Sequence, residues 1–262
     1  MTSAISNRLA GQNIIVTGAA GRIGSATARR LLQEGANLLL TDISLDSIER
    51  LVNELTSFSR GKVHSLVTDI TTIDGIDHLI TKSIDLFQVI DGAVHSAYPR
   101  SESWGSSFES MNYEHLCSDL SMQLGGAIML SQRLMRCFEA QQRGTLIHLS
   151  SIQGVSAPKF DHYAGTSMTS PVEYSAIKAG IVAITKWLAK YYANQGIRVC
   201  CVSPGGILDN QPQEFLDRYR KSCTNIGMLS ADHVASTISF LLSNDAVAVN
   251  GQNIIVDDGW IL

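Results

Sequence analysis

The sequence predicts a single α/β domain in which helices cover both faces of a doubly wound, seven-stranded parallel sheet. Short apolar runs alternate along the chain with amphipathic segments, as in proteins built from β-α-β units. The 262 residues, 45% of them hydrophobic, suffice for one buried core. No repeat, low-complexity tract or linker divides the chain, so we expect a tail at residues 1–10 and one domain over residues 11–262.

Seven apolar runs have the length and composition of strands that are buried on both faces. They lie at residues 13–16, 37–40, 63–67, 90–94, 145–149, 197–202 and 253–256. Between them, helical periodicity is clearest at residues 22–34, 120–141 and 172–194. This order predicts a parallel sheet, and sheets of this kind bind ligands at the carboxyl ends of their strands.

Two polar segments interrupt the alternation. Residues 98–110 follow the fourth strand and are rich in Ser, whereas residues 156–173 follow the fifth strand and carry Ser, Thr, Gly and Pro. Because both come after strand ends, we expect them to border a ligand site. The alternative is that they are ordinary surface loops.

A glycine-rich turn lies between the first strand and the first helix. It runs Thr-Gly-Ala-Ala-Gly-Arg-Ile-Gly over residues 17–24, with glycines at Gly18, Gly21 and Gly24. Glycines here permit a tight turn and let the backbone approach a pyrophosphate at the helix N-terminus. Such a pattern is weak by itself, but its strand–turn–helix context predicts a dinucleotide site that also includes Arg22 and Ile23.

Asp42 ends the second strand about 20 residues beyond this turn. A carboxylate there can accept hydrogen bonds from the adenosine ribose and would repel a 2′-phosphate, which favours NAD over NADP. Arg22 favours NADP weakly, and a helix N-terminal acid is the alternative for Asp42. Asp69 and Ile70 follow the third strand, where the adenine would lie; Asp69 could also cap the next helix.

Tyr174 and Lys178 are four residues apart on a predicted helix and therefore share one face. A phenol with its ordinary pKa of about 10 is a poor acid–base catalyst at neutral pH. An adjacent ammonium favours the phenolate and would lower that pKa, so that the pair could exchange a proton with an alcohol or carbonyl. An isolated pair is usually coincidental, so the surrounding motifs decide its meaning.

Charge and cysteine content exclude several function classes. The net charge is −4, with no basic run, so nucleic acid is not an expected partner. No apolar stretch reaches the roughly 18 residues needed to span a membrane, and residues 1–9 do not form a signal peptide. Five cysteines without CxxC spacing indicate free thiols in the cytoplasm and no metal site.

Together these motifs resemble the classical short-chain dehydrogenase/reductase family from about Gly11 to the C-terminus. The family's Tyr-x-x-x-Lys matches Tyr174 and Lys178, and the serine of its Ser-x-x-Gly motif falls on Ser151. The resemblance implies a Rossmann fold, a nicotinamide cofactor, catalysis by Ser151, Tyr174 and Lys178, and homodimers or homotetramers. Further positions that it assigns to the cofactor are Ser96, Ala97, Tyr174, Lys178, Pro204, Gly205 and Ile207.

The chain departs from the family pattern at several positions. Residues 95–98 are His-Ser-Ala-Tyr where Asn-Asn-Ala-Gly is usual, so Tyr98 replaces a glycine. Gln123 falls near the position of the family's fourth catalytic residue, an asparagine that holds a relay water. Asp209 stands where a threonine often contacts the nicotinamide carboxamide.

Tyr163 competes with Tyr174 for the catalytic position. It lies the usual distance in sequence from Ser151, but residue 167 is Ser167, so it lacks the activating lysine. Tyr174 is therefore the predicted catalytic tyrosine, and residues 156–173 become an insertion that would overhang the active site.

Residues 163–174, 204–212 and 251–259 resemble those of a bacterial subgroup, the flagellin modification protein A-like enzymes of surface-sugar biosynthesis. This resemblance implies an NAD-dependent oxidoreductase acting on a secondary alcohol or ketone of a sugar derivative. Two alternatives are a reductase of acyl or small carbonyl substrates and a catalytically idle NAD-binding sensor or assembly subunit.

Overall fold

A seven-stranded parallel sheet forms the centre of the computed structural model, which describes residues 7–57 and 60–262. The strands are β1 (Asn13–Thr17), β2 (Asn37–Asp42), β3 (Val63–Val67), β4 (Gly92–His95), β5 (Gly144–Leu149), β6 (Ile197–Pro204) and β7 (Asn253–Val256). Their order in the sheet is β3-β2-β1-β4-β5-β6-β7, and every neighbouring pair is parallel. The predicted doubly wound α/β fold is confirmed.

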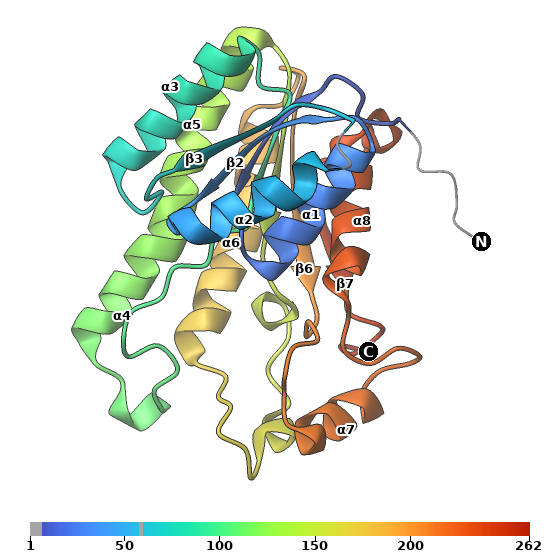
Figure 1. The fold of residues 1–262 in the computed structure, drawn as a ribbon. Helices are drawn as coiled ribbons and strands as arrows, with labels where there is room; N and C mark the ends of the chain where they lie inside the picture. The colour runs from blue at the N-terminus through green and yellow to red at the C-terminus, as the bar shows by residue number, and fades with distance from the viewer. Residues whose placement is uncertain (1–6, 58–59) are drawn as a thin grey trace.

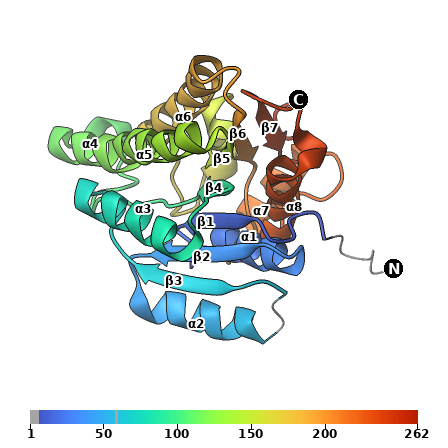
Figure 2. The same cartoon turned by 90° about the horizontal axis from the view of Figure 1, so that it is seen from above.

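Helices cover both faces of this sheet (Figures 1 and 2). One face carries α1 (Arg22–Gln33), α2 (Leu45–Thr56) and α8 (Ala231–Leu242), and the other α3 (Ile73–Phe87), α5 (Gly126–Gln141) and α6 (Val172–Tyr191). The alternating side chains of β1 explain this arrangement, because Ile14 and Val16 enter the first core and Ile15 enters the second. Two further helices, α4 (Tyr113–Asp119) and α7 (Gln213–Lys221), lie beyond the carboxyl ends of the strands (Figure 1).

The predicted helix at residues 120–141 belongs to a longer helical segment. It begins with α4, continues as a π-helix over Leu120–Gly125 and ends with α5. Such π-turns are rare and often lie at functional sites. The predicted helix at residues 172–194 ends earlier, at Tyr191, since Asn194 and Gly196 adopt left-handed backbone angles that no helix continues.

The start of the described chain is packed against the domain. Leu9 is fully buried, and the Arg8 guanidinium forms a two-pronged ion pair with the buried carboxylate of Glu34. Burial would raise the pKa of Glu34, but the hydrogen bonds from Arg8 and Arg30 outweigh it and lower that pKa. Residues 1–6 of the predicted tail lie outside the described residues.

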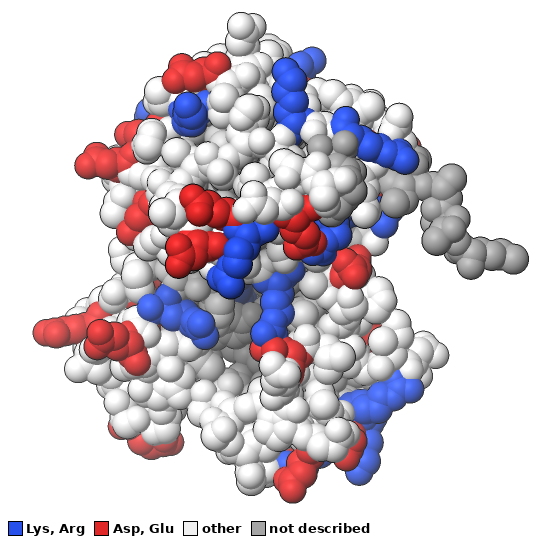
Figure 3. Space-filling view, viewed as in Figure 1, with Lys and Arg blue, Asp and Glu red and all other residues white. Residues whose placement is uncertain are grey.

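The surface carries both signs of charge. On the face in Figure 3, Lys and Arg side chains alternate with Asp and Glu and do not gather into one basic patch. Among the described residues, no helix combines the length and apolar character that crossing a bilayer requires.

Candidate active site

The candidate site lies at the carboxyl ends of β1 and β4, where the winding direction of the sheet reverses. From β1 the chain proceeds to β2 on one side, while β4 pairs with β1 on the other side. The loops that follow these two strands separate there and leave a crevice. The glycine-rich turn enters it from β1.

The glycines of this turn are required by close backbone contacts. Gly18 has a φ of 61°, and a Cβ atom there would lie 2.5 Å from the Cα atom of Ala97. A Cβ on Gly24 would lie 2.2 Å from the Gly18 carbonyl oxygen. Gly21 precedes α1 and offers no side-chain cap, so the first N–H groups of the helix stay available to an anion.

A cavity of about 630 Å³ opens beside the turn. Seven predicted cofactor-binding residues line it: Gly18, Gly21, Asp42, Asp69, Ile70, Ser96 and Ala97. The small side chains, the free helix N-terminus and the acidic residue at the end of β2 fit the pyrophosphate and ribose of a dinucleotide. The same cavity reaches Tyr98 and Met122.

The acidic groups of this cavity are held by the backbone. The Asp42 carboxylate accepts from the N–H of Ala20 at 3.0 Å and from that of Ser44 at 3.2 Å. Asp69 accepts from the N–H and hydroxyl of Thr71 and does not cap α3, because Thr72 supplies that cap. The alternative role considered for Asp69, as an N-cap, is therefore wrong.

Arg22 does not lie in the cofactor cavity. Its guanidinium pairs with the Asp209 carboxylate, and its side chain borders a separate surface pocket with Ser25 and Arg29. The pairing places Asp209 over the first turn of α1. A guanidinium that is neutralised in this way is a poor partner for a 2′-phosphate.

A second chamber, of about 270 Å³, contains the predicted catalytic serine and tyrosine. Ser151 and Tyr174 line it together with four predicted cofactor residues, Ile23, Pro204, Gly205 and Ile207. Ser151 is 6% exposed, and its hydroxyl accepts from the N–H of Gln153 at 3.2 Å.

Lys178 lies beneath this chamber and joins α6 to the end of β5. Its ammonium donates to the Leu149 carbonyl at 3.1 Å, while its own carbonyl accepts from the Ser150 hydroxyl at 2.7 Å. A Cβ on Gly154 would lie 2.7 Å from the Lys178 carbonyl carbon. This contact explains the glycine of the Ser-x-x-Gly motif, since only glycine lets the turn pack so closely on the helix.

Burial controls the acid–base properties of these groups. It raises the pKa of Tyr174, and a hydrogen bond with Ser151 opposes that rise. The Lys178 ammonium lies 5.5 Å from the centroid of the Tyr174 ring. Burial lowers the pKa of Lys178 from 10.5 to about 8, so the amine stays mostly charged at pH 7.

Aromatic and imidazole side chains replace the smaller residues expected around Lys178. The Tyr98 ring lies 5.6 Å from that of Tyr174 and 5.3 Å from the Lys178 ammonium. His95 is buried against the Thr17 hydroxyl at 2.9 Å, and burial, with the charge of Lys178, lowers its pKa to about 4. His95 is therefore neutral at pH 7.

Gln123 is 3% exposed and lies in the π-helix. Neither its amide nitrogen nor its amide oxygen has a hydrogen-bond partner in the described structure. A buried amide without partners costs stability.

The insertion at residues 156–173 forms one wall of the catalytic chamber through Tyr163 and Met168. It packs against α7 and the C-terminus. The Lys159 ammonium donates to the Trp260 backbone carbonyl at 2.9 Å and lies 4.6 Å from the centroid of the Trp260 ring. The Arg218 guanidinium, on α7, donates to the carbonyl of Ala164.

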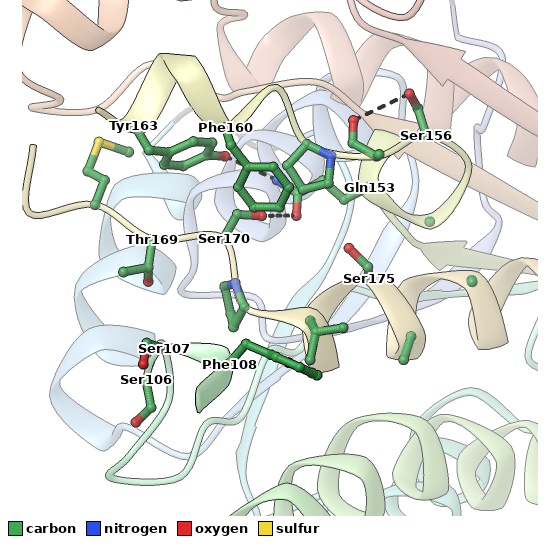
Figure 4. A pocket seen from close by; sticks show the side chains of 18 of the residues that line it. Ser106, Ser107, Phe108, Gln153, Ser156, Phe160, Tyr163, Thr169, Ser170 and Ser175 are labelled. Carbon is green, nitrogen blue, oxygen red and sulfur yellow. Dashed lines mark hydrogen bonds between the residues drawn. The ribbon is translucent and has the colours of Figure 1, made fainter. Parts of the chain in front are cut away.

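A larger outer groove, of about 930 Å³, lies on the other side of this wall (Figure 4). A chain of hydrogen bonds separates the two spaces. Ser170 donates to Gln153 at 2.7 Å, and Gln153 donates to the Tyr163 hydroxyl at 3.2 Å. Phe108 and Phe160 line the groove and are exposed. Tyr163 is therefore part of the wall between the two spaces, whereas Tyr174 is the tyrosine with a lysine, Lys178, four residues later on the same helix.

Sequence reasoning missed several residues of the chamber. They are Gln153, His162, Gln211, Phe215, Tyr219, Met228 and Trp260. Phe215 and Tyr219 come from α7 and Trp260 from the chain end, and no local pattern connects these segments to Ser151. The one available signal was Trp260, which directly follows residues 256–259, Val-Asp-Asp-Gly, where the family resemblance has its terminal Val-Asp-Gly-Gly.

The chain is similar over nearly its whole length to several known proteins. A family model described as Enoyl-(Acyl carrier protein) reductase matches residues 18–261. Post-translational flagellin modification protein A of Campylobacter coli is 43% identical over 248 residues, 94% of this chain and 97% of that protein. Glucose 1-dehydrogenase of Gluconobacter oxydans is 30% identical over 270 residues, which cover 100% of this chain and 96% of that protein. A structure of a short chain dehydrogenase from Leptospira borgpetersenii with bound NAD+ has a TM-score of 0.87 and 27% identity, covering 100% and 97%.

We expect Lys178→Met to stabilise the protein at pH 7. Burial lowers the amine pKa from 10.5 to about 8, which corresponds to a destabilisation of the folded protein by roughly 3 kcal/mol that the substitution removes. The substitution also removes the hydrogen bond to Leu149, and this loss offsets about 1 kcal/mol of the gain. Denaturant unfolding should show a gain of about 2 kcal/mol. The gain should shrink as pH rises from 8 towards 10.5, because the folded wild type has then released the proton that the unfolded chain still holds.

The matched control for this substitution is Lys190→Met, which replaces an exposed lysine on the same helix. Its stability should change by less than about 0.5 kcal/mol. Equal changes in stability for the two substitutions, or a loss of stability in Lys178→Met, would contradict the conclusion that the buried ammonium of Lys178 destabilises the folded protein.

Proposed function

Since this chain belongs to the short-chain dehydrogenase/reductase family and is an NAD(P)-dependent oxidoreductase, we propose that it uses NAD(H) to interconvert a secondary alcohol and a ketone on a sugar-derived substrate. The observation that carries the proposal is the convergence of Ser151 and Tyr174 in one chamber, with Lys178 beneath it. The adjoining cavity has the glycine turn and acidic residue that suit a dinucleotide.

Each of the three residues has a distinct role in this proposal. When NAD is bound, its nicotinamide supplies the hydride acceptor. Tyr174 exchanges the proton of the substrate hydroxyl, and Ser151 hydrogen-bonds the same oxygen. Lys178 contributes a positive charge close to the tyrosine and to the cofactor ribose. Because burial raises the pKa of Tyr174, added positive charge is needed to bring the phenol into a useful range.

Gln123 is proposed to take the place of the family's relay asparagine. Its buried, unpartnered amide could hold a water and extend a proton path away from Lys178. The π-turn supports this role, since such turns often lie at functional sites.

A sugar-derived substrate is supported by two kinds of observation. Two relatives that match nearly the full chain are named for flagellin modification and for glucose oxidation. The chamber combines aromatic rings with the amides of Gln153 and Gln211, a mixture that suits a polar ring with apolar faces.

We place the reaction in the cytoplasm, where the five free cysteines would persist as thiols.

Replacing Tyr174 with Phe should reduce kcat/KM by roughly 10²–10⁴-fold, because the proton-transfer group is lost. NADH binding, measured by fluorescence titration, should be unchanged. The control is Tyr163→Phe, which removes the other candidate hydroxyl and should retain turnover within about tenfold. Sugar alcohols and acyl thioesters should be profiled with both variants. Efficient turnover by Tyr174→Phe would rule out the role assigned to Tyr174. If the wild type binds NADH but turns over neither sugar alcohols nor acyl thioesters, the alternative of a catalytically idle NAD-binding protein is favoured.

Asp42→Asn should weaken NADH binding by roughly tenfold, since the amide replaces a charged acceptor of the ribose hydroxyls. It should also narrow the preference for NADH over NADPH, because the carboxylate that repels a 2′-phosphate is gone. Dissociation constants for both cofactors would show this, with Asp46→Asn, an exposed acid of α2, as control. Tighter binding of NADPH than of NADH by the wild type would contradict the NAD assignment.

We propose that the protein forms homodimers or homotetramers through α6. Exposed apolar residues run along this helix: Val172, Ala176, Ala179, Ala183, Trp187 and Tyr191. The rings of Trp187 and Tyr191 stack with centroids 4.6 Å apart and are 60% and 64% exposed. Such a stripe on a surface helix is typical of an interface.

The double variant Trp187→Glu/Tyr191→Glu should lower the molar mass measured by light scattering, because it places two like charges in the proposed contact. Lys186→Glu, on the same helix and also exposed, should leave the mass unchanged. A wild type that is monomeric, or a double variant with unchanged mass, would exclude this interface.

A further inference from the structure

The cofactor cavity has a single basic side chain. Among the described residues that line it, Asp42 and Asp69 are acidic and only Arg100 is basic. Arg100 is exposed, and in the part of the chain that the structure describes its guanidinium forms no ion pair. Arg22, in contrast, borders a different pocket and is paired with Asp209. Arg100 is therefore the one uncompensated positive charge beside this cavity in the described structure.

The contacts of its neighbours hold the segment that carries Arg100. Ser101 donates twice to the buried carboxylate of Asp119, from its N–H and from its hydroxyl, each at 2.7 Å. On the other side, Pro99 restricts the rotation of the backbone. The guanidinium carbon of Arg100 lies 5.4 Å from the centroid of the Tyr98 ring, within the range of a cation–π contact. Because Tyr98 also lines the cavity, this contact keeps the guanidinium at its border.

The charges around the cavity indicate which ligand group Arg100 suits. The carboxylates of Asp42 and Asp69 repel an anion, yet a dinucleotide brings a negatively charged pyrophosphate into the same cavity. The N-terminus of α1 contributes only about half an elementary positive charge. A guanidinium carries a full charge, and its planar set of N–H groups matches two oxygens of one phosphate. Arg100 can thus balance the charge of a phosphate that the two carboxylates oppose.

We propose that Arg100 binds a phosphate group in the cofactor cavity. It approaches from the segment after β4, while the N-terminus of α1 approaches from the segment after β1. The phosphate has two candidate sources, the pyrophosphate of the dinucleotide and a phosphate ester on the substrate beside it. This inference rests on the proposed function, in which this cavity holds the dinucleotide.

The pyrophosphate is tested by the substitution Arg100→Gln, which removes the charge and keeps a polar side chain. NADH binding, measured by fluorescence titration, should weaken roughly tenfold, since a hydrogen bond between charged groups is lost. Adenosine has no phosphate, so its competition with NADH should give the same adenosine dissociation constant in both proteins. Arg100→Lys keeps the charge without the planar geometry and should weaken NADH binding less than Arg100→Gln. Added sodium chloride should weaken NADH binding more in the wild type than in Arg100→Gln.

Inorganic phosphate tests the second source. It is titrated into the NADH-saturated protein and its binding is followed by phosphorus-31 NMR. If Arg100 serves a phosphorylated substrate, the NADH affinity of Arg100→Gln is unchanged, while its NADH complex binds inorganic phosphate roughly tenfold more weakly than that of the wild type. If Arg100→Gln changes neither the NADH affinity nor the phosphate affinity, the proposal is overturned.

The matched control is Arg143→Gln. It removes an exposed guanidinium just before β5, at the end of the sheet opposite to the cavity. Both affinities should stay at their wild-type values, and an equal loss in Arg143→Gln and Arg100→Gln would also overturn the proposal. None of these measurements needs turnover. If the wild type oxidises no sugar alcohol but Arg100→Gln loses NADH affinity, the proposed reaction fails and the role of Arg100 stands.

Discussion

The position of α6 on the end of β5 is the constraint on which the candidate site depends. Two hydrogen bonds fasten Lys178, one from its ammonium to Leu149 and one to its carbonyl from Ser150. Because the ammonium is buried, it requires an acceptor, and the strand end supplies one. Ser151 follows that strand directly, so the same contacts bring its hydroxyl into one chamber with Tyr174. The buried ammonium of Lys178 destabilises the fold, but its need for an acceptor helps to position the groups of the site.

The enclosure of the chamber depends on a second set of long-range contacts. The insertion, α7 and the C-terminus enclose the chamber. Asp258 connects the C-terminal segment to the loop that follows α7, because its carboxylate accepts from the N–H groups of Asn225 and Gly227. Asp258 has a φ of 55°. Its hydrogen bonds compensate for a backbone conformation that an L-residue adopts reluctantly. The chain end is thereby available to contribute Trp260 to the chamber.

Much of the fold and part of the site were predictable from local patterns. The apolar runs became the strands of the sheet, with β4 beginning two residues later than expected, at Gly92. Sequence patterns did not reveal the π-turn around Gln123, because it differs from an α-helix by one residue in hydrogen-bond spacing. Nor did they reveal that Asp209 would neutralise Arg22, since the two residues are 187 positions apart in the chain. The raised pKa of Tyr174 likewise depends on burial, which only packing produces.

By itself, the sequence determined the order of strands and helices, the glycine turn and the Tyr174–Lys178 pair. Each of these depends on residues within a few positions of one another, where the periods of strands and helices and the freedom of glycine act directly. The tertiary structure alone decided which side chains surround the reacting groups. His162 and Trp260 are almost a hundred positions apart, and only the burial of the aromatic cluster brings them together, because that packing depends on the whole chain at once.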